Sequence, residues 1–425
     1  MKPKLAIIGT GISGLGCGHF LHKDFDIHLY EQNEHIGGHS FTVDAKENNK
    51  QIPIDMGFMV FNKKTYPNLT RLFDELNVGY KNSNMSFSVQ HLGQNLEYCG
   101  SSLNHLFGQR KNIFNLHHWR MLMQINRFNN EAREALESGQ FDTLTLEEYV
   151  KVKNYGEDFF QLYIVPMSSA IWSTPPKLML QFPATTLLRF FNNHGFLGMN
   201  TQHQWLTPKG GSREYVKKLT KPFRGRISTN NKILKVSRAD KRATVHTADG
   251  QSYSYDKIIL AGHADQSLAL LDSPILEEKQ ELSKFKYQKN VGTLHTDPSS
   301  MPQNKLCWAS WNYRIKEDTY GELIPRTIYW MNNLQNVSKE TNYFVSINGE
   351  DEINPKKIIK QVEFEHPLFD SAAVNAQSKL HSLNQSSPEQ TIYFCGSYFK
   401  YGFHEDALNS AMDLSSTILG RPLWS

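Results

Sequence analysis

The stretch KLAIIGTGISGLGCGHFL, residues 4–21, decides the fold of this chain. Its first five residues are an apolar run that predicts a buried parallel strand, and residues 12–21 predict a helix directly after it. The turn between them, residues 9–14, has the pattern G-x-G-x-x-G. Such glycines allow a tight turn, close approach of the backbone to a pyrophosphate and tight helix packing, and the helix N-terminus attracts the phosphates. With a further strand predicted at 27–30, the segment is a βαβ unit that favours dinucleotide binding.

Later turns favour FAD over NAD. Glu31 ends the second strand about twenty residues after Gly11, where a carboxylate can accept hydrogen bonds from the ribose hydroxyls of an adenosine. Gly37-Gly38-His39-Ser40 follows shortly, and plain NAD folds lack such a second turn. Asp55-Met56-Gly57 and Cys395-Gly396-Ser397 each follow a predicted strand. We expect these separated turns to converge on one extended cofactor.

Composition excludes several classes of protein. The 425 residues are 39% hydrophobic, enough for two or three domains. With 46 Lys and Arg against 42 Asp and Glu, no global basic field points to nucleic acid. The 4 cysteines form no Cys-x-x-Cys pair, which argues against a zinc site or a disulfide scaffold and favours a reducing cytoplasm. Glycines interrupt the N-terminal apolar run, so a signal peptide is not expected, and no apolar stretch approaches the roughly 18 residues of a membrane span.

Longer runs carry a family resemblance. They are residues 55–62 (DMGFMVFN), 84–89 (NMSFSV), Val165-Pro166 with 171–173 (IWS), 205–207 (WLT), 308–312 (WASWN) and 402–406 (GFHED). With them the chain resembles the flavin-containing amine oxidase superfamily along nearly its whole length. It is most similar to the flavin domain that occurs as a separate bacterial protein or fused N-terminally to plant cyclopropane-fatty-acid synthases.

The resemblance implies an α/β fold with a discontinuous nucleotide domain. Strands suited to a parallel sheet occur at the start, in the middle (258–261) and at the end (392–395) of the chain. Between them, residues 103–152 are helical in pattern, 226–245 are strand-like before a hairpin at Gly250, and 404–419 predict a last helix. We expect a glutathione-reductase-like (Rossmann-type) FAD-binding domain from 1–85, 203–272 and 388–425, and an α+β substrate domain from 86–202 and 273–387.

The resemblance also assigns residues to the cofactor. FAD is expected to be non-covalent, because no cysteine stands where a covalent link would form, and Cys395 is expected to be a buried inert thiol. The broader superfamily has an arginine and an acidic residue where this chain has His39 and Ser397. The implied contacts are Gly9, Gly11, Ile12, Ser13 and Gly14 at the pyrophosphate, Glu31 at the ribose, the backbone of Ile233 at the adenine, Gly37, Gly38 and His39 near the phosphates and the flavin, Gly57 and Phe58 near the isoalloxazine, and Gly396, Ser397, His404, Glu405 and Asp406 at the ribityl and the pyrimidine end.

Few side chains need be catalytic when a flavin accepts the hydride. The candidates are Tyr398, Tyr401 and His404, which follow the last glycine turn; the alternative is packing between helix and sheet. Lys305 is expected to be a solvated loop charge, His117 and His118 are expected on a helix surface, and no metal site is predicted. Apolar residues that either line a substrate cavity or form one face of a sheet are Met85, Phe87, Trp172, Trp308, Trp311, Tyr313, Tyr329 and Trp330.

Three functions stay open at this point. The first is an FAD-dependent oxidoreductase for an unsaturated or modified fatty-acyl chain, acting as desaturase, oxidase or double-bond isomerase. The second is an FAD amine or porphyrinogen oxidase. The third is a non-catalytic flavoprotein partner of a cyclopropane-synthase-like methyltransferase.

One helical stretch is both basic and rich in apolar side chains. It either lies on an anionic membrane surface, at the inner face of the membrane, or is an ordinary amphipathic helix buried against the domain. Its members are Arg110, Lys111, Arg120 and Arg127 with Ile113, Phe114, Trp119, Leu122, Met123 and Phe128.

Overall fold

The computed structural model describes residues 1–198, 201–320 and 322–424. The N-terminal unit forms as predicted: β1 (Lys4–Ile8) leads through the glycine turn into α1 (Ile12–Leu21) and on to β2 (Asp26–Tyr30). These strands lie in a parallel sheet of order β10-β2-β1-β14-β20. Its other members are β10 (Ile227–Ser228), β14 (Lys257–Leu260) and β20 (Ile392–Phe394). Strands from the start, middle and end of the chain thus share one sheet.

Small residues let helices pack closely on this sheet. A Cβ on Gly16 of α1 would lie 3.2 Å from Ala411 of α15 (His404–Leu419), so the two helices are in close contact. α10 (Arg213–Thr220) also packs against α1. The buried apolar strand residues Leu5, Ile7 and Ile259 join these helices in one core.

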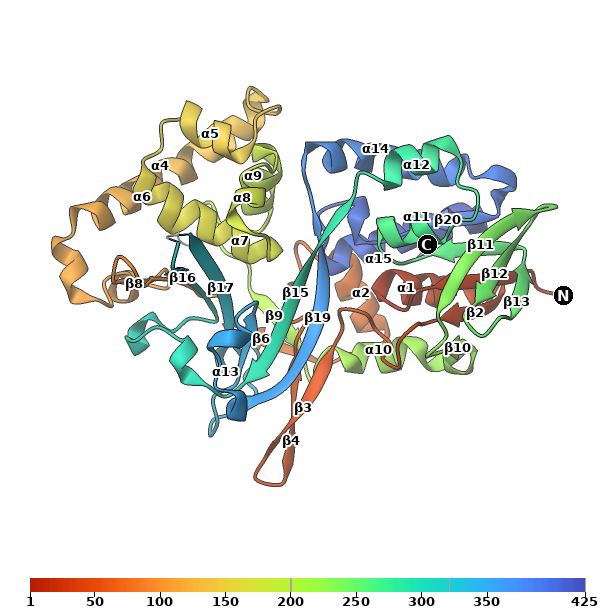
Figure 1. Ribbon diagram of the computed structural model, residues 1–425, viewed down its shortest axis with the longest axis horizontal. Helices are drawn as coiled ribbons and strands as arrows, with labels where there is room; N and C mark the ends of the chain where they lie inside the picture. The colour runs from red at the N-terminus through yellow and green to blue at the C-terminus, as the bar shows by residue number, and fades with distance from the viewer. Residues whose placement is uncertain (199–200, 321, 425) are drawn as a thin grey trace.

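A second, seven-stranded sheet has the order β19-β15-β18-β17-β16-β7-β8. Its pairs are antiparallel except β16 with β7, which is parallel. The long pair β15–β19 runs through the middle of the molecule, between the parallel sheet and the rest (Figure 1). The strands are β7 (Phe87–His91), β8 (Leu96–Cys99), β15 (Lys286–His295), β16 (Trp311–Glu317), β17 (Leu323–Trp330), β18 (Phe344–Ile347) and β19 (Ile358–Leu368).

Helices gather at the end of the molecule opposite the parallel sheet (Figure 1). The helical pattern predicted for 103–152 is confirmed. In the longest helix, α4, the buried residues recur at helical spacing, so one face packs inward. The helices are α3 (Leu103–Leu106), α4 (Leu116–Ser138), α5 (Leu146–Val152), α6 (Glu157–Phe159), α7 (Val165–Trp172), α8 (Pro176–Met179) and α9 (Ala184–Asn193), with 3₁₀ turns at Arg110–Phe114.

Smaller elements complete the fold. The strand-like segment 226–245 is divided into several strands, because Asn230 and Asp240 adopt positive φ, and a hairpin turns at Gly250 as predicted. The remaining strands are β3 (Thr42–Glu47), β4 (Lys50–Asp55), β5 (Phe61–Asn62), β6 (Tyr80–Ser83), β9 (Trp205–Pro208), β11 (Ile233–Ala239), β12 (Arg242–Thr247) and β13 (Ser252–Tyr255). The remaining helices are α2 (Pro67–Glu75), α11 (Ala264–Leu270), α12 (Leu276–Leu282), α13 (Met331–Leu334) and α14 (Ser371–Gln385).

Among the described residues, no helix is long and apolar enough to cross a bilayer. Nor do three or more His, Cys, Asp or Glu side chains in these parts of the chain come together in a group that could hold a metal ion.

Candidate functional site

The glycine turns that are far apart in the sequence pack backbone to backbone. A Cβ added to Gly38 would lie 3.1 Å from Cα of Gly11. One added to Gly57 would lie 2.1 Å from the carbonyl oxygen of His39. The third glycine turn, residues 55–57, therefore packs directly against the backbone of the second, residues 37–40. The structure therefore brings together three turns at the carboxyl edge of the parallel sheet.

The C-terminal glycine turn, at Gly396, reaches the same edge of the sheet by packing on Gly262, a glycine after β14 that the sequence analysis did not single out. A Cβ on Gly396 would lie 3.2 Å from the carbonyl oxygen of Gly262, and one on Gly9 would lie 3.1 Å from that of Ala261. Ser13 Oγ is 3.4 Å from the same Ala261 oxygen. The turn after β14 thus lies between the first and the last glycine turns, and its only sequence signal was its position after an apolar strand.

This edge fits a dinucleotide. A Cβ on Gly11 would meet nothing within 4 Å, although the residue stands at the N-cap of α1, whereas one on Gly14 would lie 2.0 Å from the carbonyl oxygen of Gly9. Gly14 is therefore required by the fold itself. Gly11 faces open space beside a helix N-terminus, which is the cradle that a pyrophosphate needs.

The predicted adenosine end lies at the corner next to this cradle. The Glu31 carboxylate accepts hydrogen bonds from Thr10 Oγ1 (2.6 Å) and from the Asn33 N–H (3.0 Å). The Asn231 N–H donates to the carbonyl of Glu31 at 2.9 Å, so the segment that leads into Ile233 starts from the same corner. The Thr10 N–H (3.2 Å) and the Asn33 side-chain amide (3.3 Å) also donate to it, so its roughly four acceptor positions are filled, and a ribose hydroxyl would have to displace one of these longer contacts.

His404 ties the last helix to the second turn. Its Nε2 lies 3.0 Å from Ser40 Oγ and 3.4 Å from the Tyr215 hydroxyl, and Ser40 and Tyr215 are hydrogen-bonded to each other. Its ring stacks on Phe58 with 3.9 Å between the ring centroids. His404 and Phe58 were both predicted to contact the cofactor, and the structure places them against each other.

His366 is a site residue that the sequence analysis missed. It lies on β19, with its ring centroid 5.4 Å from that of His39. A chain of amides fixes its tautomer: the Val291 N–H donates to Asn348 Oδ1, Asn348 Nδ2 donates to Asn290 Oδ1, and Asn290 Nδ2 then faces His366 Nδ1 at 2.7 Å. A neutral His366 consequently carries its proton on Nε2.

Burial keeps these imidazoles neutral. It lowers the pKa of His404 to about 3 and that of His366 to about 4, and it holds the pKa of His39 well below its usual value, with His366 close by as a further cause. At neutral pH these three residues therefore offer donors and acceptors without positive charge.

The side chains of Glu405 and Asp406 accept hydrogen bonds from backbone N–H groups at the N-termini of two helices. The Glu405 carboxylate accepts from the backbone N–H groups of Asn68 (3.0 Å) and Leu69 (2.9 Å) at the start of α2. Asp406 accepts from the Phe403 N–H (3.1 Å) at the start of its own helix, and burial raises its pKa to about 7. What these residues can offer a cofactor is the N-terminal backbone of α15.

The two tyrosine candidates lie in different surroundings. Tyr398 is fully buried behind the Gly396 turn, with its ring 5.2 Å from that of Phe285, and its hydroxyl has no partner among the described residues. These contacts favour the packing alternative for Tyr398. Tyr401 is half-buried, and its carbonyl accepts a hydrogen bond from Trp172 Nε1 at 3.2 Å.

A cluster of aromatic side chains joins the start of α15 to the helical region. Phe403, at the N-cap of α15, stacks on Phe190 (5.3 Å) and packs on Trp172 (6.1 Å). Phe403 and Phe196 each contact two separate hydrophobic cores, and Met85 bridges the second of these cores and a third. Phe403 escaped the sequence analysis because a phenylalanine before a helix has no chemical signature.

The other apolar candidates divide into separate clusters. Trp311 and Tyr329 pack on each other (5.0 Å) and share a core with residues that contact Met85. Trp308 and Trp330 belong to another small cluster (5.3 Å), and Tyr313 is buried beneath the helices. Trp311 also packs in the cluster of Tyr313, together with Phe87, so these three share one face of the sheet, which fits the packing alternative. Trp308 and Trp330 lie apart from them.

Three minor predictions have definite outcomes. Lys305 is exposed and Cys395 is a buried free thiol, both as predicted. His117 is exposed and pairs with Asp158 at 3.0 Å. The prediction of a surface position for His118 is wrong: this residue lies on the inward face of α4, with its ring 5.3 Å from that of Phe107.

Comparisons with known proteins identify a matching family model and solved structures of similar fold. A family model described as flavin containing amine oxidoreductase matches residues 12–305. A putrescine oxidase is 13% identical over 99% of this chain and 100% of its own, with a TM-score of 0.68. A fatty acid isomerase from P. acnes is 14% identical over 98% of both chains, also with a TM-score of 0.68. A reduced UDP-galactopyranose mutase is 16% identical over 99% of this chain and 94% of its own, with a TM-score of 0.69. No curated protein matches the chain by sequence.

Proposed function

The chain belongs to the flavin-containing amine oxidoreductases and is an FAD-dependent oxidoreductase, and from this premise we propose that its substrate is an unsaturated or modified fatty-acyl chain. The observation that carries the proposal is the apolar character of the junction next to the cofactor turns. Phe403 and Phe196 each contact the same two cores there, Trp172 adjoins Phe403, and Met85 joins the second of these cores to a third. Such side chains suit a hydrocarbon chain better than a charged amine.

The titratable groups near the cofactor turns support this choice. His39, His366 and His404 are held neutral by burial, and the Asp406 carboxyl is engaged by the backbone of Phe403. The fold is also shared by a fatty acid isomerase, at 14% identity. The resemblance to flavin domains of plant cyclopropane-fatty-acid synthases points to the same class of substrate.

We further propose how the chain holds its cofactor. A glutathione-reductase-like domain of residues 1–85, 203–272 and 388–425 would bind FAD, and residues 86–202 and 273–387 would form the substrate domain. All five strands of the parallel sheet fall in the first set and all seven of the mixed sheet in the second. Gly9 to Gly14 would meet the pyrophosphate, Glu31 the ribose and the Ile233 backbone the adenine. Gly38, His39, Gly57, Gly396 and Ser397 would line the flavin end.

Bound FAD accepts a hydride from a carbon placed against its ring. The protein's part is to orient that carbon and to exclude water, and in this proposal Phe403 and Trp172 would do both. The N-terminus of α15 contributes positive potential that stabilises negative charge at the pyrimidine end. His366 holds its proton on Nε2 and, being neutral, can donate a hydrogen bond without adding charge.

Anaerobic mixing tests the substrate class. An unsaturated fatty acid or phospholipid should bleach the oxidised flavin band, or should be isomerised while the band bleaches only transiently. The Phe403→Ala variant should slow this step by about tenfold or more with FAD still bound, because it loses orientation of the chain. Trp308→Ala, in a separate cluster, is the matched control and should react as the unaltered protein does.

Other outcomes assign the alternatives. If spermine, simple amines or porphyrinogens reduce the flavin and acyl lipids do not, the acyl proposal fails and the chain is an amine or porphyrinogen oxidase. If none of them reduces it but a cyclopropane-synthase-like methyltransferase gains activity when the protein is added, the chain is a flavoprotein subunit.

A further inference from the structure

An unusual concentration of exposed apolar side chains marks the end of the molecule farthest from the parallel sheet. α3, the 3₁₀ helix Arg110–Phe114 and the first half of α4 lie there (Figure 1). Single exposed apolar residues are ordinary on a protein surface, but a contiguous group marks an interaction site. Within residues 103–123 the exposed large apolar side chains are Leu103, Ile113, Phe114, Leu116, Trp119 and Met123.

These side chains are on the outward face of their helix. The inward face of α4 is formed by His118, Met121 and Phe128, which are buried. Leu116, Trp119 and Met123 also follow helical spacing but are 71%, 43% and 62% exposed. A helix that is apolar on both faces needs a second apolar partner, because its outward face is otherwise in water.

Trp119 connects the helix to the preceding turn. Its Nε1 donates to the carbonyl of Ile113 at 2.9 Å, and its ring lies 5.0 Å from that of Phe107. Phe114, 89% exposed, follows directly. The apolar residues of the turn and of the helix therefore form one surface, which we call the α3–α4 face: Leu103, Arg110 to Phe114, Leu116, Trp119, Arg120 and Met123.

The charged residues that belong to this face are all cations, and the exposed Glu157 of a neighbouring segment lines a pocket together with Arg120. Between Glu97 and Glu131 the sequence contains no acidic residue, whereas it contains Arg110, Lys111, Arg120 and Arg127. Lys111 and Arg120 are exposed, while Arg127 pairs with Glu131 at 2.7 Å and is set apart. The neighbouring Asp158 is paired with His117 at 3.0 Å. Exposed cations among apolar side chains complement an anionic, amphipathic partner.

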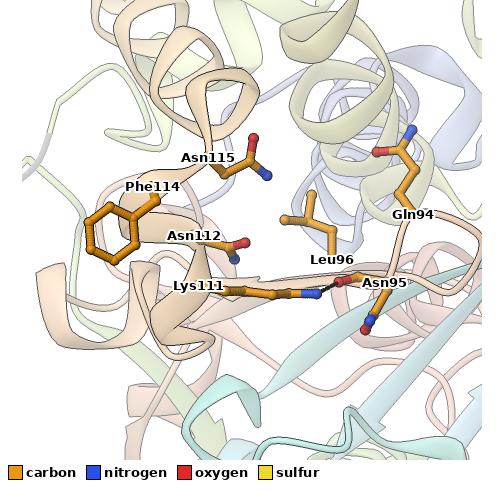
Figure 2. A pocket seen from close by; sticks show the side chains of 7 residues that line it. All are labelled: Gln94, Asn95, Leu96, Lys111, Asn112, Phe114 and Asn115. Carbon is orange, nitrogen blue, oxygen red and sulfur yellow. Dashed lines mark hydrogen bonds between the residues drawn. The ribbon is translucent and has the colours of Figure 1, made fainter.

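A polar cavity of about 180 Å³ opens beside the apolar residues. Figure 2 shows Asn112 and Asn115 turned toward it, Lys111 reaching across it to the carbonyl of Asn95 (2.7 Å), and Phe114 projecting away from it. Asn112 is 1% exposed, and its Oδ1 has no partner among the described residues. The cavity, which Phe114 borders, thus offers a cation and an unused acceptor.

We propose that the α3–α4 face docks on an anionic phospholipid bilayer, with its apolar side chains at the level of the acyl boundary and a lipid headgroup in the Lys111–Asn112 cavity. The proposal goes beyond the proposed function and does not depend on the substrate of the flavin. It divides the stretch predicted from the sequence: the surface is formed by its exposed members, whereas Phe128 belongs to the core and Leu122 is half-buried. The exposed members are Arg110, Lys111, Ile113, Phe114, Trp119, Arg120 and Met123.

Flotation of the FAD-loaded protein with vesicles tests this docking. Vesicles of phosphatidylcholine with about a third phosphatidylglycerol should carry the protein upward at low salt, and vesicles of phosphatidylcholine alone should not. The double variant Lys111→Glu and Arg120→Glu should weaken this binding by at least about tenfold, since each cation contributes a several-fold attraction. The variant Lys356→Glu and Lys360→Glu makes the same charge change on another exposed segment and should bind as the unaltered protein does.

The apolar contribution has its own pair of variants. Phe114→Ser should lower vesicle binding by about tenfold, because a fully exposed ring is lost. Leu276→Ser removes a 64% exposed side chain elsewhere and should leave binding unchanged. Flavin content and thermal midpoint confirm that each variant is folded.

Two results would overturn the proposal. The first is a protein that stays with the buffer in both kinds of vesicle, or one whose binding is the same in all four variants. The second is a dimer in light scattering without vesicles that dissociates in Phe114→Ser, which would assign the face to a second copy of the chain.

Discussion

Gly11 and Gly14 stand in the same turn but are required for different reasons. Gly11 has ordinary backbone angles, φ −64° and ψ 176°, and an added Cβ there would meet no protein atom. Gly14 has no such room, because its Cβ would meet the carbonyl of Gly9 at 2.0 Å. At Gly14 a side chain is excluded by the fold, whereas at Gly11 we propose that it is excluded by the cofactor.

Gly11→Val should therefore abolish FAD binding and leave a folded, colourless protein, since the branched side chain occupies the place of the pyrophosphate. Gly14→Ala should destabilise the protein by about 1–3 kcal/mol or more through overpacking. Flavin absorbance and urea unfolding measured on both variants distinguish the two effects. A Gly11→Val protein that keeps its flavin, or that fails to fold, would contradict the assignment.

Tyr398 allows the packing and catalytic roles to be separated. Its hydroxyl is buried without a partner among the described residues, so Tyr398→Phe should leave stability unchanged or slightly raised. Tyr398→Ala should cost about 3–5 kcal/mol, because it leaves a cavity against Phe285.

The rate of flavin reduction in Tyr398→Phe then decides the role. An unchanged rate assigns the residue to packing, as its contacts indicate. A rate that falls while FAD stays bound would instead assign the hydroxyl to the reaction.

At the scale of elements, the N-terminal end of α15 contacts three other parts of the fold. His404 connects it to the second glycine turn through Ser40, and Phe403 connects it to the helical region. Glu405 connects it to α2 by capping two backbone N–H groups. A single helix end thus holds the cofactor turns, the aromatic junction and a neighbouring helix in one arrangement.

Glu405→Ala should destabilise the protein by about 1–2 kcal/mol, because two buried donors at the start of α2 lose their acceptor. Glu405→Gln keeps one acceptor oxygen, so its free energy of unfolding should fall by less than half as much as that of Glu405→Ala. Urea unfolding of the FAD-loaded variants measures the difference. Equal losses in the two variants would show that the cap is not the source of the effect.

At the scale of the whole molecule, buried neutral histidines should make stability depend on pH. Burial lowers the pKa of His194, His295 and His366 to about 4 and that of His404 to about 3. In the unfolded chain each would have a pKa near 6.5. Below that pH the unfolded state binds protons that the native state does not, so stability falls as the pH falls.

Each such histidine lowers the free energy of unfolding by about 1.4 kcal/mol for every pH unit below about pH 6.5. This loss of stability continues down to the pKa that the histidine has in the native protein. Asp406 opposes one of the four, because its raised native pKa of about 7 means that the native state takes up a proton as the pH falls. Urea unfolding at pH 7.5 and 5.5 should therefore differ by several kcal/mol. His194→Phe should lower the slope of the free energy of unfolding against pH by about 1.4 kcal/mol per pH unit, which corresponds to one proton. A free energy of unfolding that stays constant over this range would contradict the neutral state of these side chains.

The N-terminal unit was predictable because its signals are local. The βαβ unit, the helices of 103–152 and the hairpin at Gly250 follow from periodicity and turn chemistry within short windows, and all of them form. His118 was placed wrongly, because a histidine on a helix carries no local sign of which face it occupies. Glu405 and Asp406 were recognised as site residues, but the orientation of their side chains depends on α2 and on their own helix end.

The sequence by itself determined the class of cofactor and the presence of a strand–turn–helix that can bind it, because glycine spacing acts directly on the backbone. Only the tertiary structure decided that Gly38 and Gly262 pack on the first turn, that Gly57 packs on His39 and Gly396 on Gly262, that His366 lies near His39, and that Phe403 meets Trp172. The contacts of Gly9 with Gly262, of His39 with His366 and of Trp172 with Phe403 join residues more than two hundred positions apart, and none of these residues stands out in its own segment as a partner of the other. Long-range packing brings them together, and no local pattern in the sequence records it.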